Sequence, residues 1–289
     1  MFVPAAEKGY GQAMLSVREV GLVAQREILR NIRSTKGIAM FALFFLGGLV
    51  PTVVRVMARK MAGDVPSEVL QAAFESYLVK NYGSEAIGKY LAGAPPIMYF
   101  LFQGTLTFLP LLVLAVGFDQ IAGEIQHRTI RYSAGRASRT SIVVGKALGI
   151  WGVIAVMISV LHLTVWIVTL VQGGQSVASI ITWGARFLGF SVVCAGTYVG
   201  FASLMSSIFK TPIVALFVGA GVGFAIWLLN VILGFFESTQ AITWIFPNRY
   251  EKLLIEPDPL RVLLGLALFL LWGGLCVTGA SAIVSRRDI

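Results

Sequence analysis

The sequence is poor in charge, in histidine and in cysteine. Charged residues make up 13% of the 289 residues, and only two histidines and two cysteines occur. A soluble globular domain has about 25% charged residues, so the composition excludes an ordinary soluble domain. The sequence has no catalytic triad, paired-carboxylate site or Cys/His metal spacing, and therefore offers no candidate catalytic or metal-binding residue. It also lacks a G-x-x-x-x-G-K-[ST] phosphate loop, so we do not expect the chain to hydrolyse ATP by itself.

Apolar residues are abundant instead, and they are gathered in long runs. They make up 57% of the chain, above the roughly 45–50% that is typical of soluble proteins. A helix of about 20 apolar residues crosses the hydrocarbon core of a bilayer. The sequence therefore predicts an all-α integral membrane protein with six transmembrane helices. The predicted spans are residues 37–57, 97–118, 147–171, 177–209, 213–236 and 262–284.

Lysine and arginine are unevenly distributed along the chain. Fourteen of the 23 lie in residues 1–36, in residues 119–146, at Lys210 and at the C-terminal end. Because cytoplasmic loops are enriched in Lys and Arg, we predict that these segments and both termini are cytoplasmic. The net charge of +9 is explained by this clustering beside apolar runs, so we expect no nucleic-acid partner.

Residues 1–36 form a predicted cytoplasmic arm that contains one amphipathic helix. From Ser16 onwards, apolar and charged residues alternate at roughly helical spacing. In one interpretation this helix lies on the membrane surface with its basic residues toward the lipid headgroups. In the other it is a soluble helix that packs on a partner subunit. The basic residues of the predicted membrane-interface helix are Arg18, Arg26, Arg30 and Arg33.

The remaining residues, 37–289, form the predicted six-span transmembrane domain with two notable outer segments. Residues 58–96 contain nearly balanced numbers of acidic and basic residues, as expected outside the membrane, and predict one or two short helices. Residues 237–259 are rich in aromatic and apolar residues, which favour the membrane interface. We expect this second segment to dip into the bilayer as short broken helices.

A polar, basic stretch between two of the most apolar runs covers residues 119–146. Its acidic residues are Asp119 and Glu124, and its basic residues are more numerous. A segment of this polarity is not expected within hydrocarbon, so we predict a loop in water on the cytoplasmic side. The basic residues of this loop are Arg128, Arg131, Arg136, Arg139 and Lys146.

This loop resembles the first cytoplasmic loop of type-2 ABC exporter permeases. In that family, a Glu at the end of the second membrane helix precedes a short coupling helix with the pattern T-I/L-R. A P-x-S-R turn and a G-K at the third membrane helix follow. The turn proline of the family is replaced here by Arg136. The matching residues are Glu124, Thr129, Ile130, Arg131, Ser138, Arg139, Gly145 and Lys146.

The resemblance implies a membrane-spanning permease subunit of an ABC exporter in the plasma (inner) membrane of a prokaryote. It also implies an N-terminal elbow helix and a re-entrant outer element. ATP and Mg would bind a separate cytoplasmic ABC ATPase, so no cofactor is expected in this chain. The expected assembly contains two ATPase copies and two permease copies, here a homodimer, in contact with membrane lipids. The residues expected to couple to the ATPase are Glu124, Arg128, Thr129, Arg131, Arg136, Arg139 and Lys146.

Three polar residues within the apolar runs are candidates for a translocation pathway: His162, Arg186 and Asn230. His162 stands alone in the third span, without a carboxylate near it in the sequence. Arg186 either extends to the outer membrane interface or points into a wet cavity. Asn230 either lines a pathway or forms a hydrogen bond between helices, and the sequence leaves both roles open.

Small residues recur at four-residue spacing in three of the apolar runs. This spacing places them on one helix face, where they allow another helix to approach closely. They serve either packing within the chain or contact between subunits. The three motifs are Gly145-x-x-x-Gly149, Gly196-x-x-x-Gly200 and Gly219-x-x-x-Gly223.

Three other functions were weighed against an ABC permease. A secondary transporter or channel driven by an ion gradient would be expected to carry carboxylates in the centres of its spans, and the sequence has none there. An intramembrane enzyme would need a catalytic constellation. A membrane anchor of a larger complex is compatible with the sequence. An ATPase with a phosphate loop, encoded beside this chain, would favour the exporter.

Overall fold

The computed structural model describes residues 15–61, 66–135, 137–236, 239 and 241–287, and all regular elements in these ranges are helices. Six helices are long and apolar enough to span a membrane, which confirms the all-α class and the number of spans. They are α2 (Thr35–Met61), α5 (Pro96–Gly117), α8 (Arg139–Gln172), α9 (Val177–Ile208), α10 (Pro212–Gly234) and α12 (Pro259–Arg286).

Local sequence signals explain where several of these helices begin and end. Proline, which has no backbone N–H to lose, occupies the first turn of α5, α10 and α12. The hydroxyls of Ser138 and Ser176 accept hydrogen bonds from backbone N–H groups at the starts of α8 and α9. Gly173 ends α8 with a φ of 67°, a backbone conformation that glycine adopts without steric cost.

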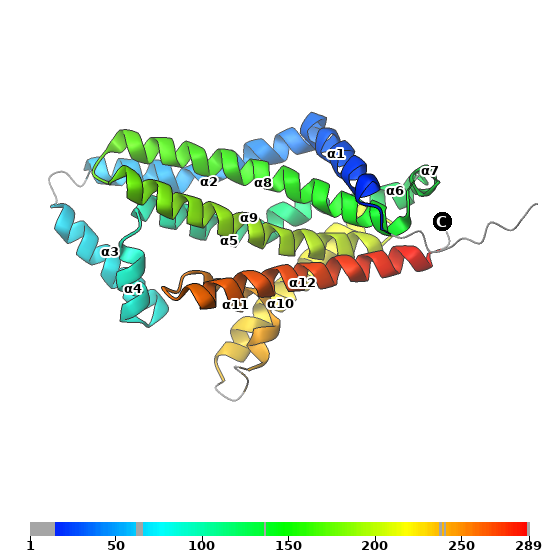
Figure 1. The fold of residues 1–289 in the computed structure, drawn as a ribbon. Coiled ribbons are helices and arrows are strands. Elements are labelled where there is room, and N and C mark those ends of the chain that lie inside the picture. Colours follow the sequence, from blue (N-terminus) through cyan, green and yellow to red (C-terminus); the bar gives the residue numbers. More distant parts are fainter. Residues whose placement is uncertain (1–14, 62–65, 136, 237–238, 240, 288–289) are drawn as a thin grey trace, which may run out of the picture.

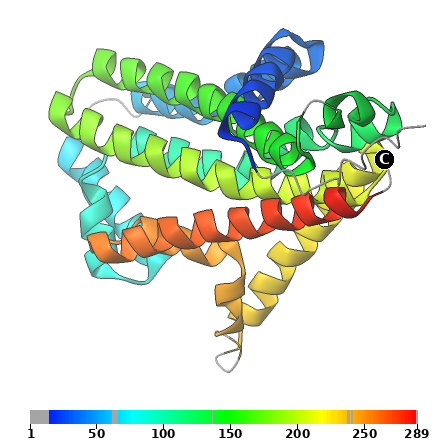
Figure 2. The same ribbon diagram turned by 45° about the vertical axis from the view of Figure 1, so that its right-hand side comes forward.

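The core of the bundle is formed by α5, α8, α9 and α12. The rings of Phe102 on α5 and Phe187 on α9 stack with their centroids 4.7 Å apart. The backbones of α9 and α12 approach closely, because a Cβ on Gly200 would lie 2.4 Å from the carbonyl oxygen of Gly273. In contrast, α2 and α10 leave most of their apolar surface uncovered, and α10 diverges from the other long helices in both views (Figures 1 and 2).

The remaining helices gather at the two ends of the bundle. At one end lie α1 (Val17–Arg33), α6 (Ala122–Gln126), α7 (Ile130–Ala134) and the last turns of α12 (Figure 1). At the other end lie α3 (Ser67–Tyr82) and α4 (Glu85–Ala92). The short helices η2 (Ile242–Ile245) and α11 (Pro247–Leu254) connect α10 to α12, and α11 packs against the first part of α12.

The polar stretch 119–146 is less of a loop than the sequence predicts. Residues 139–146 already belong to α8, which therefore begins eight residues before the predicted span. The prediction placed the span after the last charge, but a helix continues through polar residues wherever their side chains find partners. Lys146 has such partners, because its side chain is paired with two carboxylates.

Candidate functional site

Helix α1 crosses α8 in direct contact, which neither interpretation of the amphipathic helix included. A Cβ on Gly145 would lie 2.6 Å from the Cβ of Val23, and one on Gly149 would lie 2.5 Å from the Cβ of Glu27. Only glycine allows this approach, so the first of the three small-residue motifs packs within the chain. The four arginines of α1 remain exposed, at positions 18, 26, 30 and 33.

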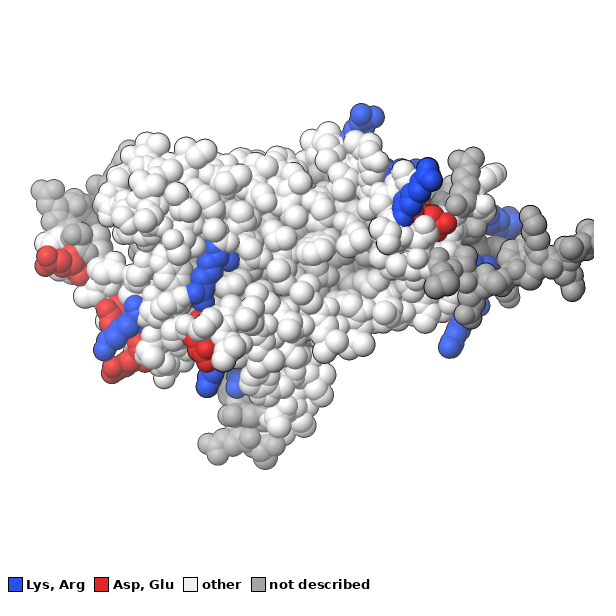
Figure 3. Space-filling model, in the orientation of Figure 1, with Lys and Arg blue, Asp and Glu red and all other residues white. Residues whose placement is uncertain are grey.

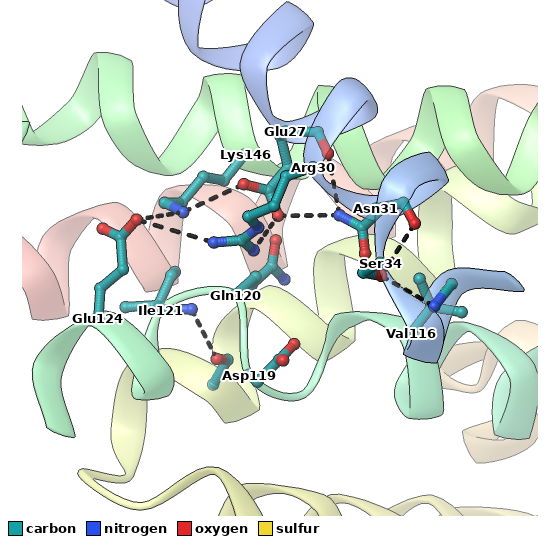
Figure 4. Close-up of polar contacts among 12 residues, drawn as sticks. Glu27, Arg30, Asn31, Ser34, Val116, Asp119, Gln120, Ile121, Glu124 and Lys146 are labelled. Carbon is teal, nitrogen blue, oxygen red and sulfur yellow. Dashed lines mark hydrogen bonds and ion pairs between the residues drawn. The ribbon is translucent and has the colours of Figure 1, made fainter. Parts of the chain in front are cut away.

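A network of four charged side chains lies under α1 (Figure 4). The ammonium of Lys146 is 3.2 Å from a carboxylate oxygen of Glu27 and 2.8 Å from one of Glu124. Arg30 pairs with Glu27 and lies 4.0 Å from Glu124. The side chains of Lys146 and Glu27 are only 5% and 4% exposed, whereas Arg30 is 44% exposed, so the network is buried at Lys146 and Glu27 and reaches water at Arg30. Two negative and two positive charges balance within it.

Because its ion pairs are largely buried, this network determines how the helices that carry it are positioned. Removing an ion from water costs several kcal/mol, and a partner at hydrogen-bond distance offsets that cost only in one geometry. Asn31 adds hydrogen bonds to Glu27, from its amide to the backbone oxygen at 3.0 Å and to the carboxylate at 3.1 Å. The network therefore fixes α1, the start of α8 and α6 relative to one another.

Two further contacts hold the start of α8. The backbone N–H of Ser138 donates to the carboxylate of Glu19 on α1 at 3.0 Å. The guanidinium of Arg139 donates to the backbone oxygens of Ser285 and Arg287, both at 2.8 Å. The beginning of α8 is thus tied to α1 on one side and to the C-terminal end of α12 on the other.

The end of α5 is anchored in the same way. Lys36, at the start of α2, donates to Asp119 at 2.7 Å and to the backbone oxygen of Val116 at 2.9 Å. The hydroxyl of Ser206 on α9 accepts hydrogen bonds from the backbone N–H groups of Ile121 and Ala122, both at 3.0 Å. The chain therefore enters the α6–α7 segment from a firmly held position.

The tip of this segment, in contrast, faces outward. His127, Arg128, Thr129, Arg131 and Tyr132 are exposed, whereas Ile130 is buried and packs the segment onto the bundle. We call these five exposed residues the α6–α7 tip. Arg128 has a φ of 55°, in the left-handed region that residues other than glycine rarely adopt. Arg136 lies outside the described residues.

A groove of about 970 Å³ runs beside the tip, between α1, α6, α7 and α8. Its walls include charged side chains of both signs, among them Glu19, Arg26 and Asp119, as well as His127 and Tyr132 from the tip. A groove that combines charged and apolar walls beside an exposed basic segment has the composition of a surface that binds another protein.

The structure brings together part of the predicted coupling set and separates the rest. Glu124, Arg139 and Lys146 are occupied by contacts inside the chain. Arg128, Thr129 and Arg131 belong to the exposed tip. The predicted set therefore divides into residues that hold the loop in place and residues that remain available to a partner.

The three candidate pathway residues do not form one site. His162 is buried on α8, with its ring Nε2 3.4 Å from the hydroxyl of Thr105. Arg186 donates to the backbone oxygens of Leu254 and Glu256 and also bonds the hydroxyl of Tyr90, so it joins α9 to α11 and α4. Asn230 lies on the largely uncovered helix α10 and is half-buried.

A carboxylate that the sequence analysis did not single out lies beside α9. Glu251 lies on α11, outside the six long helices, and lines this region together with Tyr198. Burial raises the pKa of Glu251 to about 7, and the nearby hydroxyl of Tyr198 lowers it in part. It lines a second cavity, of about 320 Å³.

Sequence reasoning also missed Glu27, Lys36 and Asp119 as positioning residues. Glu27 is charged and was assigned to the polar face of an amphipathic helix, although it shares a buried face with Val20 and Asn31. The spacing of seven and four residues between these three positions was the available signal. No local pattern indicated its partner Lys146, which is 119 residues away.

Two comparisons with known proteins complete the description of this chain. A family model described as "ABC-2 family transporter protein" matches residues 22–271, which include α6, α7, α8 and most of α1. A search of curated proteins finds no match.

Proposed function

Since the chain belongs to the ABC-2 transporter family, we propose that it is the permease subunit of an exporter driven by ATP hydrolysis in a separate chain. The family consists of membrane subunits of ABC transporters and implies partnership with an ABC ATPase. In the proposed complex, ATP and Mg bind that ATPase, and this chain provides the path through the plasma (inner) membrane of a prokaryote.

The observation that carries the proposal is an exposed basic tip on a rigidly held base. The α6–α7 tip presents Arg128 and Arg131 to water, while Glu124, Lys146 and Glu27 hold its base through buried ion pairs. A flexible loop would absorb the displacement of a docked partner. A loop fixed on three helices passes it on to α8 and α5.

The chemistry of the tip favours an acidic partner surface. Guanidinium groups form strong hydrogen bonds with carboxylates, often through two parallel bonds. Tyr132, which is 80% exposed, adds an aromatic side chain of the kind enriched at protein interfaces. We infer that the ATPase docks on the tip and along the groove beside it.

The first test is recovery of the ATPase with permease variants that carry reversed charge. The permease is purified with an ABC ATPase of the same organism that copurifies with the wild-type chain, as wild type and with Arg128→Glu and Arg131→Glu. Each change is expected to lower ATPase recovery at least tenfold, since losing a desolvated charge pair costs about 2–5 kcal/mol. Thermal stability of the permease should stay within about 0.5 kcal/mol of wild type, because both residues are exposed.

Arg286→Glu is the matched control, as Arg286 is exposed at the same end of the bundle but lies on α12. It is expected to leave ATPase recovery unchanged. Full recovery with both tip variants would mean that these arginines only orient the chain in the membrane, and the docking proposal would fail.

We also propose that two copies of this chain assemble through α2 and α10. These two spans have only 11% and 6% of their most apolar windows buried, against 67% for α9. Leu46 on α2 and Phe217 on α10 are 64% and 72% exposed. A face of this kind is covered either by lipid or by another helix, and six spans from each of two copies would enclose a pathway.

The second test is cysteine crosslinking in membranes. The two native cysteines, Cys194 and Cys276, are buried, so the background is low. Leu46→Cys and Phe217→Cys are expected to give covalent dimers, whereas Leu275→Cys on the exposed face of α12 is not. Dimers from Leu275→Cys alone would place the interface elsewhere.

A further inference from the structure

The second cavity combines aromatic walls with a single charge. It lies between α5, α9, α10, α11 and α12, and Glu251 is the one charged residue among the described residues that line it. Apolar side chains and a few neutral polar groups form the rest of the wall. The aromatic residues at the cavity are Tyr198, Phe201, Phe224, Trp227 and Trp272.

Small residues on α10 create the space. Gly219, Ala220 and Gly223 line the cavity on one face of that helix. A Cβ on Gly219 would lie 2.9 Å from a methyl carbon of Leu114, and one on Gly223 would lie 3.9 Å from the ring of Phe201. Larger side chains at these positions would fill the cavity or push α10 away, so the third small-residue motif keeps it open.

The charge of Glu251 lacks a cationic partner in the described chain. No described Lys or Arg lies within ion-pair distance of its carboxylate. An unpaired negative charge is costly in apolar surroundings, so a bound cation would favour the charged form of this carboxyl group. The other acidic residue nearby, Glu256, is paired with Arg261 at 2.8 Å.

We propose that this cavity binds an organic cation with an apolar body, either a protonated amine or a quaternary ammonium group. The faces of aromatic rings attract cations, and Trp is the strongest of them. Glu251 supplies the countercharge, and the leucine and phenylalanine side chains receive the apolar part. Its volume is near the lower end of ligand pockets, which suits a ligand of modest size.

A metal ion fits these walls less well. Ca²⁺ needs six or more oxygen ligands, and transition metals need several His, Cys or carboxylate groups. Among the residues that the structure describes, no group of three or more His, Cys, Asp or Glu could hold a metal. One carboxylate among aromatic rings recognises a large, weakly hydrated cation instead.

That this cation is the exported substrate rests on the proposed function, whereas its binding does not. Binding is therefore measured on the purified permease without ATPase, by calorimetry in nanodiscs of phosphatidylglycerol. The probe is phenyltrimethylammonium, and tert-butylbenzene is the neutral molecule of the same shape. We expect saturable binding of the cation and at least tenfold weaker binding of the neutral molecule.

The key variant is Glu251→Gln, which keeps the size and polarity of the side chain but removes the charge. It should weaken cation binding at least tenfold and leave tert-butylbenzene unaffected. Glu256→Gln is the matched control, because Glu256 is on the same connection between α10 and α12 but does not line the cavity. Trp227→Leu keeps the charge, removes an aromatic face and should weaken cation binding several-fold.

Thermal unfolding of each variant confirms that it folds. Equal affinity for the cation in wild type and in folded Glu251→Gln, or equal binding of the neutral molecule, would overturn the proposal. If cation binding holds while the ATPase does not dock, the proposed function fails and this site stands. If the ATPase docks but the cation does not bind, the proposed exporter function stands and organic cations are not its substrates.

Two sources supply such a cation, and a second nanodisc separates them. Phosphatidylethanolamine carries an amine in its headgroup, whereas phosphatidylglycerol carries none. If phenyltrimethylammonium binds equally well in both discs, the site takes a free cation. If phosphatidylethanolamine weakens its binding, the site takes a lipid headgroup, and cation recognition by Glu251 is supported in either case.

Discussion

The two ends of the helix bundle use charge in different ways. In the sequence, the segments predicted to be cytoplasmic contain fourteen Lys and Arg against six acidic residues, whereas the rest of the chain has nine against eight. At the end of the bundle that holds α1, α6 and α7, the ion pairs of Lys146 are largely buried. At the other, the pair between Lys89 and Glu85 is mostly exposed, and acidic and basic groups lie close together on the surface (Figure 3). Charged side chains therefore position helices at one end, whereas at the other end most of them make the surface hydrophilic.

The sharpest test of this contrast is Lys146→Met. The change leaves the buried Glu27 and the partly buried Glu124 with only the more exposed Arg30 as a cationic partner. We expect a loss of about 3–5 kcal/mol in the free energy of unfolding, measured by denaturant titration in detergent. Lys89→Met at the opposite end is the matched control. A loss below about 1 kcal/mol for Lys146→Met would remove the distinction between the two ends.

Arg186 tests this comparison in another way, because it is a positioning charge at the end of the bundle that holds α3 and α4. Its guanidinium bonds two backbone oxygens of the α11 segment and lies near the rings of Tyr90, Trp183 and Phe190. Arg186→Gln is expected to lower stability by about 2–3 kcal/mol. Hydrogen exchange of α11 should rise with it, whereas Arg261→Gln should leave that exchange unchanged.

The smallest effect is expected for Lys89→Ala. The pair with Glu85 is exposed on α4 at a spacing of four residues, and such pairs contribute about 0.3–0.5 kcal/mol. Denaturant titration at low and high salt should give differences from wild type below about 0.5 kcal/mol. A loss above 1 kcal/mol would show that the end with α3 and α4 also depends on its surface ion pairs.

The six spans were predictable from the sequence because hydrocarbon imposes a length and a composition on each of them. The predicted boundaries of the spans α5, α9 and α10 fall within two residues of the observed ends. The start of α8 was predicted late, since hydropathy reports where charge stops and not where helical hydrogen bonds begin. The arginines of the tip were also visible as charges in a polar stretch.

The base of the site was not predictable from local patterns. Glu27 and Lys146 belong to different elements, and their pairing follows from the crossing of α1 over α8. That crossing depends on two things. The sequence shows the first, which is the absence of side chains at Gly145 and Gly149, but it does not show the second, which is the helix that packs into the space they leave. The environment of Glu251 was not predictable for the same reason, because α11 places this residue beside α9, some fifty residues earlier in the sequence.

The length of α8 has a mechanical consequence. At about 1.5 Å per residue, its 34 residues extend about 51 Å, well beyond the roughly 30 Å of the hydrocarbon core. Contacts of Lys146 and Arg139 hold one end of the helix. The helix terminates at the other end beside Gly173 and Gly174, which both have positive φ. A stiff rod of this length that turns by about 5° around the glycine end moves its charged end by about 4 Å. A rigid helix of this length would work as a lever, in which a shift of a few ångströms at the charged end corresponds to a tilt of a few degrees within the membrane.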